Sequence, residues 1–295
     1  MAAVVVIHGI GKQYLGELTL HRGIAPALLD GLSRAGHHTL TAKDIRVAFY
    51  GHCFRNPGGT TAKGGQAALR GGAEAGRFQT EGRFETELLL AWWQEAARLE
   101  PDRVPAPLKG AKAPVPVTAQ RVLRALSRSR FLTRAGDRFL LGVLRQVRSY
   151  LGEREVRERV QAEIAAAVEP DTRVIVGHSL GSVVAYEALC AHPEWPVRTL
   201  VTVGSPLGIP RLVFDRLTPG PVGGRGTWPG GIHRWTNICD RYDVVALAKE
   251  LAPLFTGGPA TVDDVLVDNG WQAHTVEHHL TAEQTGRAIA IGLTG

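Results

Sequence analysis

The residues with the clearest potential for chemistry are Gly177-His178-Ser179-Leu180-Gly181. A β-branched run at 174–176 precedes this pentapeptide, and an apolar, helix-compatible stretch follows it. This order predicts a nucleophile elbow, in which a sharp strand-to-helix turn holds a serine hydroxyl above a sheet. The residues two before and two after that serine pack too closely for a β-carbon, which accounts for Gly177 and Gly181. Ser179 is therefore the candidate nucleophile.

A serine hydroxyl becomes a useful nucleophile only when a histidine accepts its proton. We expect that histidine in the loop after the last predicted strand, 262–267, and His274 lies there. His278 and His279 fall inside a predicted helix over 277–292, so we expect them at the surface. His178 is expected to have a packing role inside the elbow. The remaining candidates, His192 and His233, lie in the wrong segments.

The histidine in turn needs an acid that fixes its tautomer and stabilises its charged form. Where a nucleophile elbow is followed by its partners, the chain order is nucleophile, acid and histidine. Asp240 and Asp243 follow the predicted strand 234–239 and both satisfy this order. The weaker alternatives are Asp263, Asp264 and Asp268.

Three stretches together resemble a known family. They are the His8-Gly9 strand end, the elbow pentapeptide, and Asn237-x-x-Asp240-x-x-Asp243-x-Val245-Ala246. They resemble bacterial serine hydrolases of the α/β-hydrolase superfamily, of an esterase or lipase-like kind close to the short lipases. The resemblance covers 3–11, 174–208 and 234–292, and 55–151 has no counterpart in it.

The resemblance implies roles for individual residues. It selects Asp243 as the acid, because the family's acid is the aspartate of an Asp-x-Val segment, and leaves Asp240 as a capping or turn residue. It implies that the backbone amides of Ile10 and Leu180 form the oxyanion hole. His8 and Gly9 would support that hole from the strand end. A phosphate-binding loop at Gly9-x-Gly11-Lys12 is excluded by its spacing.

Buried-strand patterns alternate with helical patterns along the chain, which predicts an α/β protein with a doubly wound, mostly parallel sheet. We interpret 1–295 as one domain, with the α/β-hydrolase fold and a short N-terminus. A helical insertion or cap over 55–151 leaves the carboxyl end of an early strand, where ligands bind in such sheets. A lid, a pocket wall and a static cap all fit it. The expected strands are 3–7, 44–50, the β-branched run 174–176 before the elbow, 197–204, 234–239 and 262–267. Within the insertion we expect a mobile loop at 55–82, helices at 84–99, 118–130 and 136–151, and an extended connector at 101–116.

The net charge of +6 is unevenly distributed. Between Arg103 and Val160 there are 14 lysines and arginines but four acidic residues. Basic helices over 118–151, with Arg138, Arg145 and Arg148 away from the apolar stripe, could face an anionic membrane or an acidic partner. Solvated outer helix faces explain the same pattern. Nucleic acid is not expected as a partner, because no recognition motif accompanies the charge.

The three cysteines, Cys53, Cys190 and Cys239, are widely separated and form no Cys-x-x-Cys pair. Their spacing argues for a reducing compartment and against both a disulfide framework and a structural zinc, and no metal site is evident in the sequence. The apolar run near the N-terminus is too short for a signal peptide or a membrane span, so we expect a cytoplasmic protein.

These observations lead to one functional expectation with alternatives. The leading hypothesis is a serine hydrolase that cleaves a small-molecule carboxylic ester through an acyl-enzyme, a reaction that requires no cofactor. A thioesterase, or an amidase or peptidase, would use the same residues. A hypothesis from another class is a membrane- or partner-binding module on a hydrolase scaffold.

Overall fold

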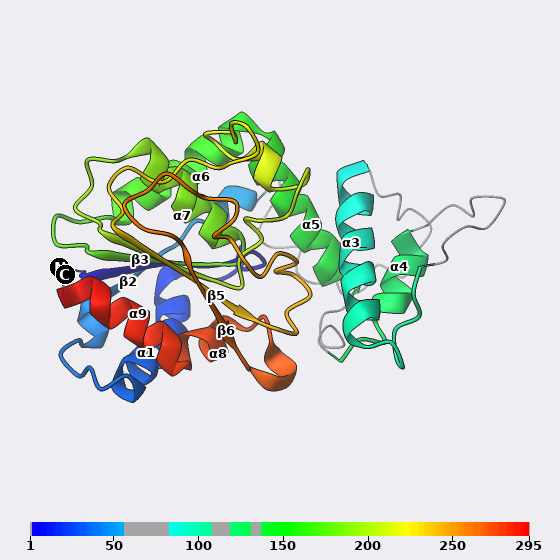
Figure 1. The fold of residues 1–295 in the computed structure, drawn as a ribbon, viewed down its shortest axis with the longest axis horizontal. Coiled ribbons are helices and arrows are strands. Elements are labelled where there is room, and N and C mark those ends of the chain that lie inside the picture. Colours follow the sequence, from blue (N-terminus) through cyan, green and yellow to red (C-terminus); the bar gives the residue numbers. More distant parts are fainter. Residues whose placement is uncertain (1, 56–82, 108–118, 131–136, 295) are drawn as a thin grey trace, which may run out of the picture.

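The computed structural model describes residues 2–55, 83–107, 119–130 and 137–294. Within them, a six-stranded parallel sheet lies between two helical layers (Figure 1). The strand order along the sheet is β2-β1-β3-β4-β5-β6. The predicted α/β class and the parallel sheet are therefore confirmed.

Strands and helices mostly end within a few residues of the predicted positions. The strands are β1 (Val4–Ile7), β2 (Ile45–Ala48), β3 (Val174–His178), β4 (Thr199–Val203), β5 (Arg234–Asp240) and β6 (Asp263–Val267). The α-helices are α1 (Glu17–Arg34), α3 (Arg83–Leu99), α4 (Ala119–Leu126), α5 (Asp137–Gly152), α6 (Arg154–Ala167), α7 (Leu180–Ala191), α8 (Val276–Thr281) and α9 (Glu283–Thr294). Short 3₁₀ helices are η1 (Ala42–Asp44), η2 (Gly51–Phe54), η3 (Phe214–Arg216) and η4 (Gly270–Gln272).

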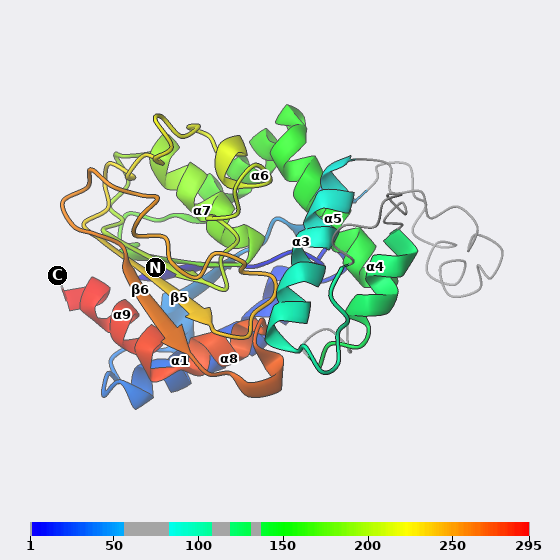
Figure 2. The same cartoon turned by 45° about the vertical axis from the view of Figure 1, so that its right-hand side comes forward.

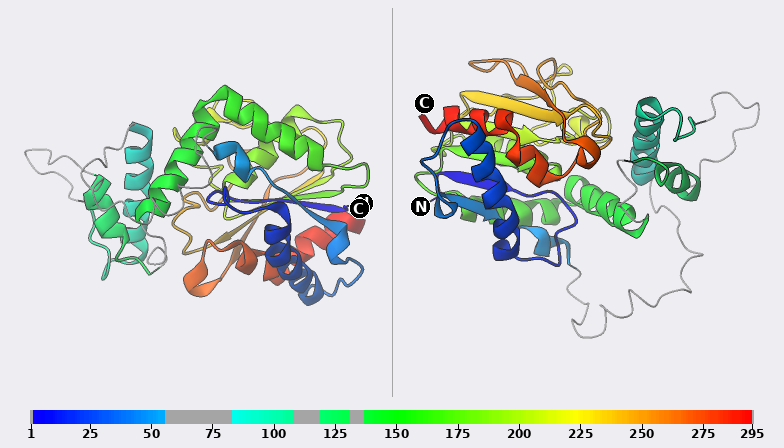
Figure 3. Two further views of the ribbon diagram at one scale, coloured as in Figure 1. Left: turned by 180° about the vertical axis from the view of Figure 1, so that it is seen from behind. Right: turned by 90° about the horizontal axis from the view of Figure 1, so that it is seen from below.

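The central strands β1, β3 and β4 are buried at every position because both of their faces are covered. In β1, Val5 and Ile7 belong to the apolar cluster that includes α6 and α7. Val4 and Val6 belong to the opposite cluster, which includes α1, α8 and α9. Figure 3 shows these two helical layers from behind the molecule and from below. The sheet therefore contributes side chains to two hydrophobic cores, one on each of its faces.

The sheet reverses its direction of growth between β1 and β3. The chain runs from β1 outward to β2, then returns to place β3 on the other side of β1. Ligands bind at such a switch point, beyond the carboxyl ends of the strands. Because Ile7 pairs with Gly177, the register brings His8 and Gly9 beside His178 and Ser179. The topology therefore places the elbow in the sheet's natural binding crevice.

The described helices of the insertion lie beyond the edge where the strands end (Figure 2). α3 packs against both α4 and α5, and α5 leads into α6 on the sheet. α4 ends at Leu126, four residues before its predicted end. The predicted mobile loop lies outside the described residues except for Arg55, and so does the connector beyond residue 107. In the part of the chain that is described, no helix is both long and apolar enough to span a membrane.

The prediction of one helix over 277–292 is wrong. Ala282 has an extended backbone, with φ −64° and ψ 135°, and separates α8 from α9. This break lets both helices pack on α1, where contacts require glycine. A β-carbon on Gly286 would lie 1.9 Å from the carbonyl oxygen of Gly31. The sequence pattern is periodic through the break and does not reveal it.

We therefore expect Gly286→Ala to destabilise the protein by about 1–3 kcal/mol, because the added methyl overpacks the helix crossing. Gly142→Ala is the matched control, since Gly142 also lies within a helix but its β-carbon would meet nothing within 4 Å. The control should be neutral or stabilising by up to about 1 kcal/mol. Urea unfolding measures both. Equal effects of the two substitutions would contradict this account of the crossing.

Candidate active site

Ser179 occupies the strained turn that the pentapeptide predicts. Its backbone has φ 53° and ψ −128°, between the end of β3 and the start of α7. A β-carbon on Gly177 would lie 2.6 Å from Cα of Ser182. One on Gly181 would lie 2.3 Å from the carbonyl oxygen of Ile7. Both glycines therefore allow backbone contacts that no other residue permits.

The structure brings three predicted side chains into one hydrogen-bonded chain. Nε2 of His274 lies 3.0 Å from Oγ of Ser179. Nδ1 of His274 lies 2.7 Å from Oδ2 of Asp243. A carboxylate can only accept, so Nδ1 carries the proton and Nε2 is left to accept from the serine hydroxyl. This is the tautomer that a general base for Ser179 requires.

Asp243 is fully buried yet remains ionised. Its Oδ1 accepts from the backbone amides of Val245, at 2.9 Å, and Ala246, at 3.3 Å. Burial raises the pKa of its carboxyl, but His274, the hydrogen bond between them and the Lys249 ammonium together hold that pKa below its usual range. Lys249 itself donates to the carbonyl oxygen of Asp243. The acid is therefore a fixed negative charge facing the imidazole.

The hydrogen bonds of the candidate aspartates show which of them interacts with His274. The hydrogen bond and ion pair of His274 go to Asp243, whereas Asp240 accepts from the amides of Tyr242, at 2.7 Å, and Asn269. It thereby ties the turn that carries Asp243 to the loop after β6. The weaker candidates serve elsewhere. Asp264 accepts from Leu251, Ala252 and Asn237, Asp268 accepts from the amide of Gly270, and Asp263 is exposed.

The predicted oxyanion donors flank the serine. A β-carbon on Gly9 would lie 3.0 Å from Cβ of Ser179, so the turn after β1 passes directly beside this serine. Ile10 is the next residue of that turn, and Leu180 is the first residue of α7. Within the described residues, neither amide has a hydrogen-bond partner. Two unpaired donors beside a serine can hold a negative oxygen.

His8 supports this turn from within the sheet. Its Nδ1 donates to the carbonyl oxygen of Gly9, and its Nε2 accepts from the amide of Tyr50 at 3.2 Å. The imidazole also stacks on the Tyr50 ring, with 4.2 Å between centroids. Burial lowers the pKa of His8 to about 4, so the ring stays neutral and holds both bonds.

Gly204, which the sequence analysis does not single out, lies against the His274–Asp243 pair. It follows β4 with φ 55°, and a β-carbon there would lie 3.0 Å from Oδ2 of Asp243 and 3.1 Å from Nδ1 of His274. Ser205 follows it and shares a 2.7 Å hydrogen bond with Ser182, which donates to the carbonyl oxygen of Ser179. A glycine at the end of the strand next to the elbow is the signal that could have identified Gly204.

The prediction that His279 lies at the surface is wrong, because α8 turns it into the core. His279 is buried, whereas His278 is exposed. His178 is also buried, and its Nε2 donates to the carbonyl oxygen of His274 at 2.9 Å. Burial, opposed by Asp243, lowers the pKa of His279 to about 4. Burial and then His274 hold the pKa of His178 well below the usual histidine value.

The insertion contacts the site directly. Oε1 of the buried Gln146, on α5, accepts from the amide of Gly11 at 3.0 Å. The guanidinium of Arg130 lies 4.2 Å above the ring of Trp271, three residues before His274. The turn after β1 that carries Ile10 (the oxyanion turn) and the loop that carries His274 therefore both contact the insertion.

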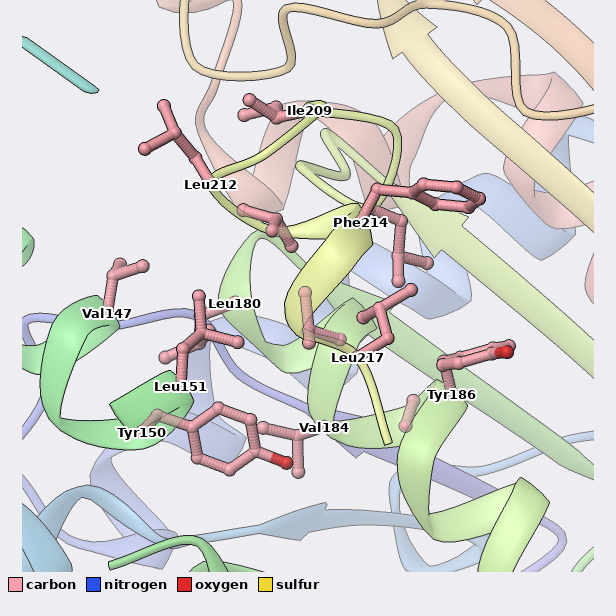
Figure 4. Close-up of a cluster of buried hydrophobic side chains, with 14 of the residues drawn as sticks. Val147, Tyr150, Leu151, Leu180, Val184, Tyr186, Ile209, Leu212, Phe214 and Leu217 are labelled. Carbon is pink, nitrogen blue, oxygen red and sulfur yellow. The ribbon is translucent and has the colours of Figure 1, made fainter. Parts of the chain in front are cut away.

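Apolar side chains surround the start of α7. Figure 4 shows Leu180 close to Val147 and Leu151 of α5, in a cluster that continues into the loop after β4. The buried side chains that pack around the candidate donor at Leu180 are thus mostly apolar. Other members of the cluster are Tyr150, Val184, Tyr186, Ile209, Leu212, Phe214 and Leu217.

Comparisons with known proteins add no relative. No protein-family model matches the chain, and searches of curated proteins and of solved structures found no match either. Among the described residues, the donors able to share one metal ion, His52, Cys53 and Glu163, lie outside the site. The site's chemistry is therefore argued from its own geometry.

The buried histidines predict a loss of stability in acid. The pKa values of His8 and His279 are about 4 in the folded protein and about 6.5 when unfolded, so the unfolded chain takes up protons first. Stability should therefore fall as the pH drops from about 6.5 to about 4, by about 2 kcal/mol per histidine between pH 7 and pH 5.

Urea unfolding at several pH values measures this loss. In His279→Gln, the free energy of unfolding should fall less between pH 7 and pH 5, by the part assigned to His279. This holds even if the substitution lowers stability at pH 7. His278→Gln, at the exposed neighbouring position, should keep the full dependence. Identical pH slopes in the two variants would refute the assignment of the effect to His279.

Proposed function

We propose that the protein is a serine hydrolase of the α/β-hydrolase type that cleaves a carboxylic ester through an acyl-enzyme intermediate. The observation that carries the proposal is the hydrogen-bonded chain from Ser179 through His274 to the buried Asp243, at 3.0 and 2.7 Å. An imidazole within reach of the serine hydroxyl, oriented and stabilised by a fixed negative charge, is the arrangement that activates a serine.

In the proposed reaction, Oγ of Ser179 attacks the ester carbonyl carbon while its proton passes to Nε2 of His274. The carbonyl oxygen becomes an oxyanion, which the amides of Ile10 and Leu180 stabilise by roughly 3–4 kcal/mol per donor. Asp243 stabilises the imidazolium through Nδ1. The imidazolium then gives its proton to the leaving alkoxide oxygen, and the alcohol departs.

The second half of the reaction reuses the same groups. The neutral imidazole of His274 takes a proton from water as the water oxygen attacks the acyl carbon. The second tetrahedral oxyanion occupies the same two amides. On its collapse, Oγ of Ser179 leaves the acyl carbon and recovers the proton, and a carboxylic acid is released.

The surroundings of the nucleophile support an apolar acyl group. Leu180 packs with Val147 and Leu151, and the described side chains around them are mostly apolar. A charged acyl chain would be desolvated there without a partner, which is costly. Thioester and amide hydrolysis use the same machinery, so a panel of esters, thioesters and amides with graded acyl chains distinguishes these substrate classes.

The alternative of a membrane- or partner-binding module receives less support. Two arginines of the basic region form ion pairs within the protein: Arg148 with Glu85 at 3.0 Å, and Arg130 with the buried Glu100 at 2.8 Å. These charges are partly neutralised where they lie. Arg138, the first of the three predicted surface arginines, lies where side chains are not described.

Labelling by a fluorophosphonate tests the nucleophile. The wild-type protein should form one stable phosphonyl-serine adduct, because the reagent reacts only with an activated hydroxyl. Ser179→Ala should abolish the adduct, and Ser127→Ala, which removes an exposed serine, should leave it unchanged. Intact-mass spectrometry measures the outcome. An adduct retained in Ser179→Ala would overturn the proposal.

Substitution of the two neighbouring aspartates tests the acid. Asp243→Asn replaces a hydrogen-bond acceptor with an amide that favours the wrong imidazole tautomer, so kcat should fall by about 10⁴-fold. Asp240→Asn weakens the connection between this turn and the loop after β6 but leaves the Asp243–His274 pair in place, so kcat should fall by less than about tenfold. Steady-state hydrolysis of a short aryl ester measures both. A larger effect at Asp240 would assign the acid to that residue instead.

A further inference from the structure

A second cluster of reactive side chains lies at the base of the insertion. His52 and Cys53 lie in η2, just before the chain enters the insertion, and Glu163 lies in α6, after it returns. Nε2 of His52 is 3.2 Å from Oε1 of Glu163 and 3.7 Å from Sγ of Cys53. All three donor atoms lie within 4.8 Å of one another. None of these residues takes part in the candidate active site.

The geometry does not suit a second nucleophile. In a nucleophile–base–acid relay, each ring nitrogen of the histidine faces a different partner, as in His274. In this cluster both partners contact the same nitrogen of His52. Burial and the Glu163 charge also raise the pKa of the Cys53 thiol, with Arg159 opposing them. Three electron-pair donors converge on one point, which is the arrangement of ligands around a cation.

We propose that His52, Cys53 and Glu163 bind a divalent metal ion, and that zinc fits them best. Zinc takes thiolate, imidazole and carboxylate ligands in tetrahedral geometry. Its bond lengths give nitrogen–sulfur and nitrogen–oxygen edges of about 3.6 and 3.3 Å. The measured separations of 3.7 and 3.2 Å match those edges. Three protein ligands leave the fourth position to water.

The charges around the cluster also suit a cation. Glu163 and a Cys53 thiolate supply two negative charges, and Arg159, which donates to the Cys53 carbonyl oxygen at 3.3 Å, offsets one of them. Zinc binding displaces the thiol proton into solvent, so the affinity should rise with pH. His52 and Glu163 are each partly exposed, which leaves an entry path from solvent.

Metal binding would join the two segments from which the insertion extends. Two ligands come from η2, before the insertion in the sequence, and the third comes from α6, after it. Because the two segments are far apart in the sequence, no short spacing motif indicates the site. A bound ion should therefore raise the thermal stability of the whole protein. The inference is independent of the proposed hydrolase activity, and Ser179→Ala should bind zinc as the wild type does.

Titration of the reduced, full-length protein with zinc and with cobalt tests the inference. We expect one equivalent of zinc to bind and to raise the thermal midpoint. Cobalt should produce a thiolate-to-metal charge-transfer band. Cys53→Ser should abolish that band, and Cys53→Ser, His52→Gln and Glu163→Gln should each weaken zinc binding by at least about tenfold.

Matched controls distinguish this site from incidental surface binding. Cys190→Ser removes another free cysteine, and His192→Gln removes the histidine of an exposed His192–Glu194 pair at 2.9 Å. Both should retain the band and the affinity. Far-ultraviolet circular dichroism and metal-free unfolding verify that each variant folds. The absence of stoichiometric binding, or zinc binding that Cys53→Ser and Glu163→Gln leave unchanged, would overturn the inference.

Discussion

Close backbone packing at the carboxyl ends of β1, β3 and β4 is the constraint on which the candidate site depends. Gly9 passes beside Ser179, Gly181 lies against the end of β1, and Gly204 lies against the His274–Asp243 pair, each where a β-carbon would overlap a neighbour. The positive φ of Ser179 persists because the sheet and α7 determine the backbone on both sides of it. The positions of Ser179, His274 and Asp243 therefore depend on this close packing.

The electrostatics of the site favour a charged form for one buried group and neutral forms for the buried histidines beside it. Asp243 is ionised, while His178 and His279 beside it are neutral at pH 7 because burial disfavours their charged forms. A neutral imidazole at His274 can accept a proton from serine and gains stability from the carboxylate once it is charged. Buried cationic neighbours would remove that advantage. The histidine cluster therefore keeps the Asp243 charge available to His274.

The insertion is part of this arrangement. α5 supplies Gln146, which bonds to the oxyanion turn, and apolar side chains that pack beside Leu180. The same helix is anchored to the sheet layer, since Tyr150 donates to the buried Glu187 of α7 at 2.6 Å. α5 therefore connects the helical layer on the sheet with the turn after β1.

Strong local signals account for what was predictable. The β-branched runs predict buried strands because a strand covered on both faces is apolar throughout, and this pattern leads correctly to a parallel α/β sheet. The pentapeptide predicts the turn at Ser179 because only glycine tolerates the contacts around it. Chain order places His274 and the Asp240–Asp243 segment at one sheet edge, because parallel strands all end there.

The sequence by itself determined the class of fold, the position of the candidate nucleophile and the segments that hold its candidate partners, because these follow from local patterns and chain order. Only the tertiary structure decided that Asp243 rather than Asp240 contacts His274, that His279 is buried, and that Gln146 reaches Gly11. Those outcomes depend on where α8 breaks and on how α5 docks against the sheet. Both are set by contacts between residues far apart in the chain, which no local pattern encodes.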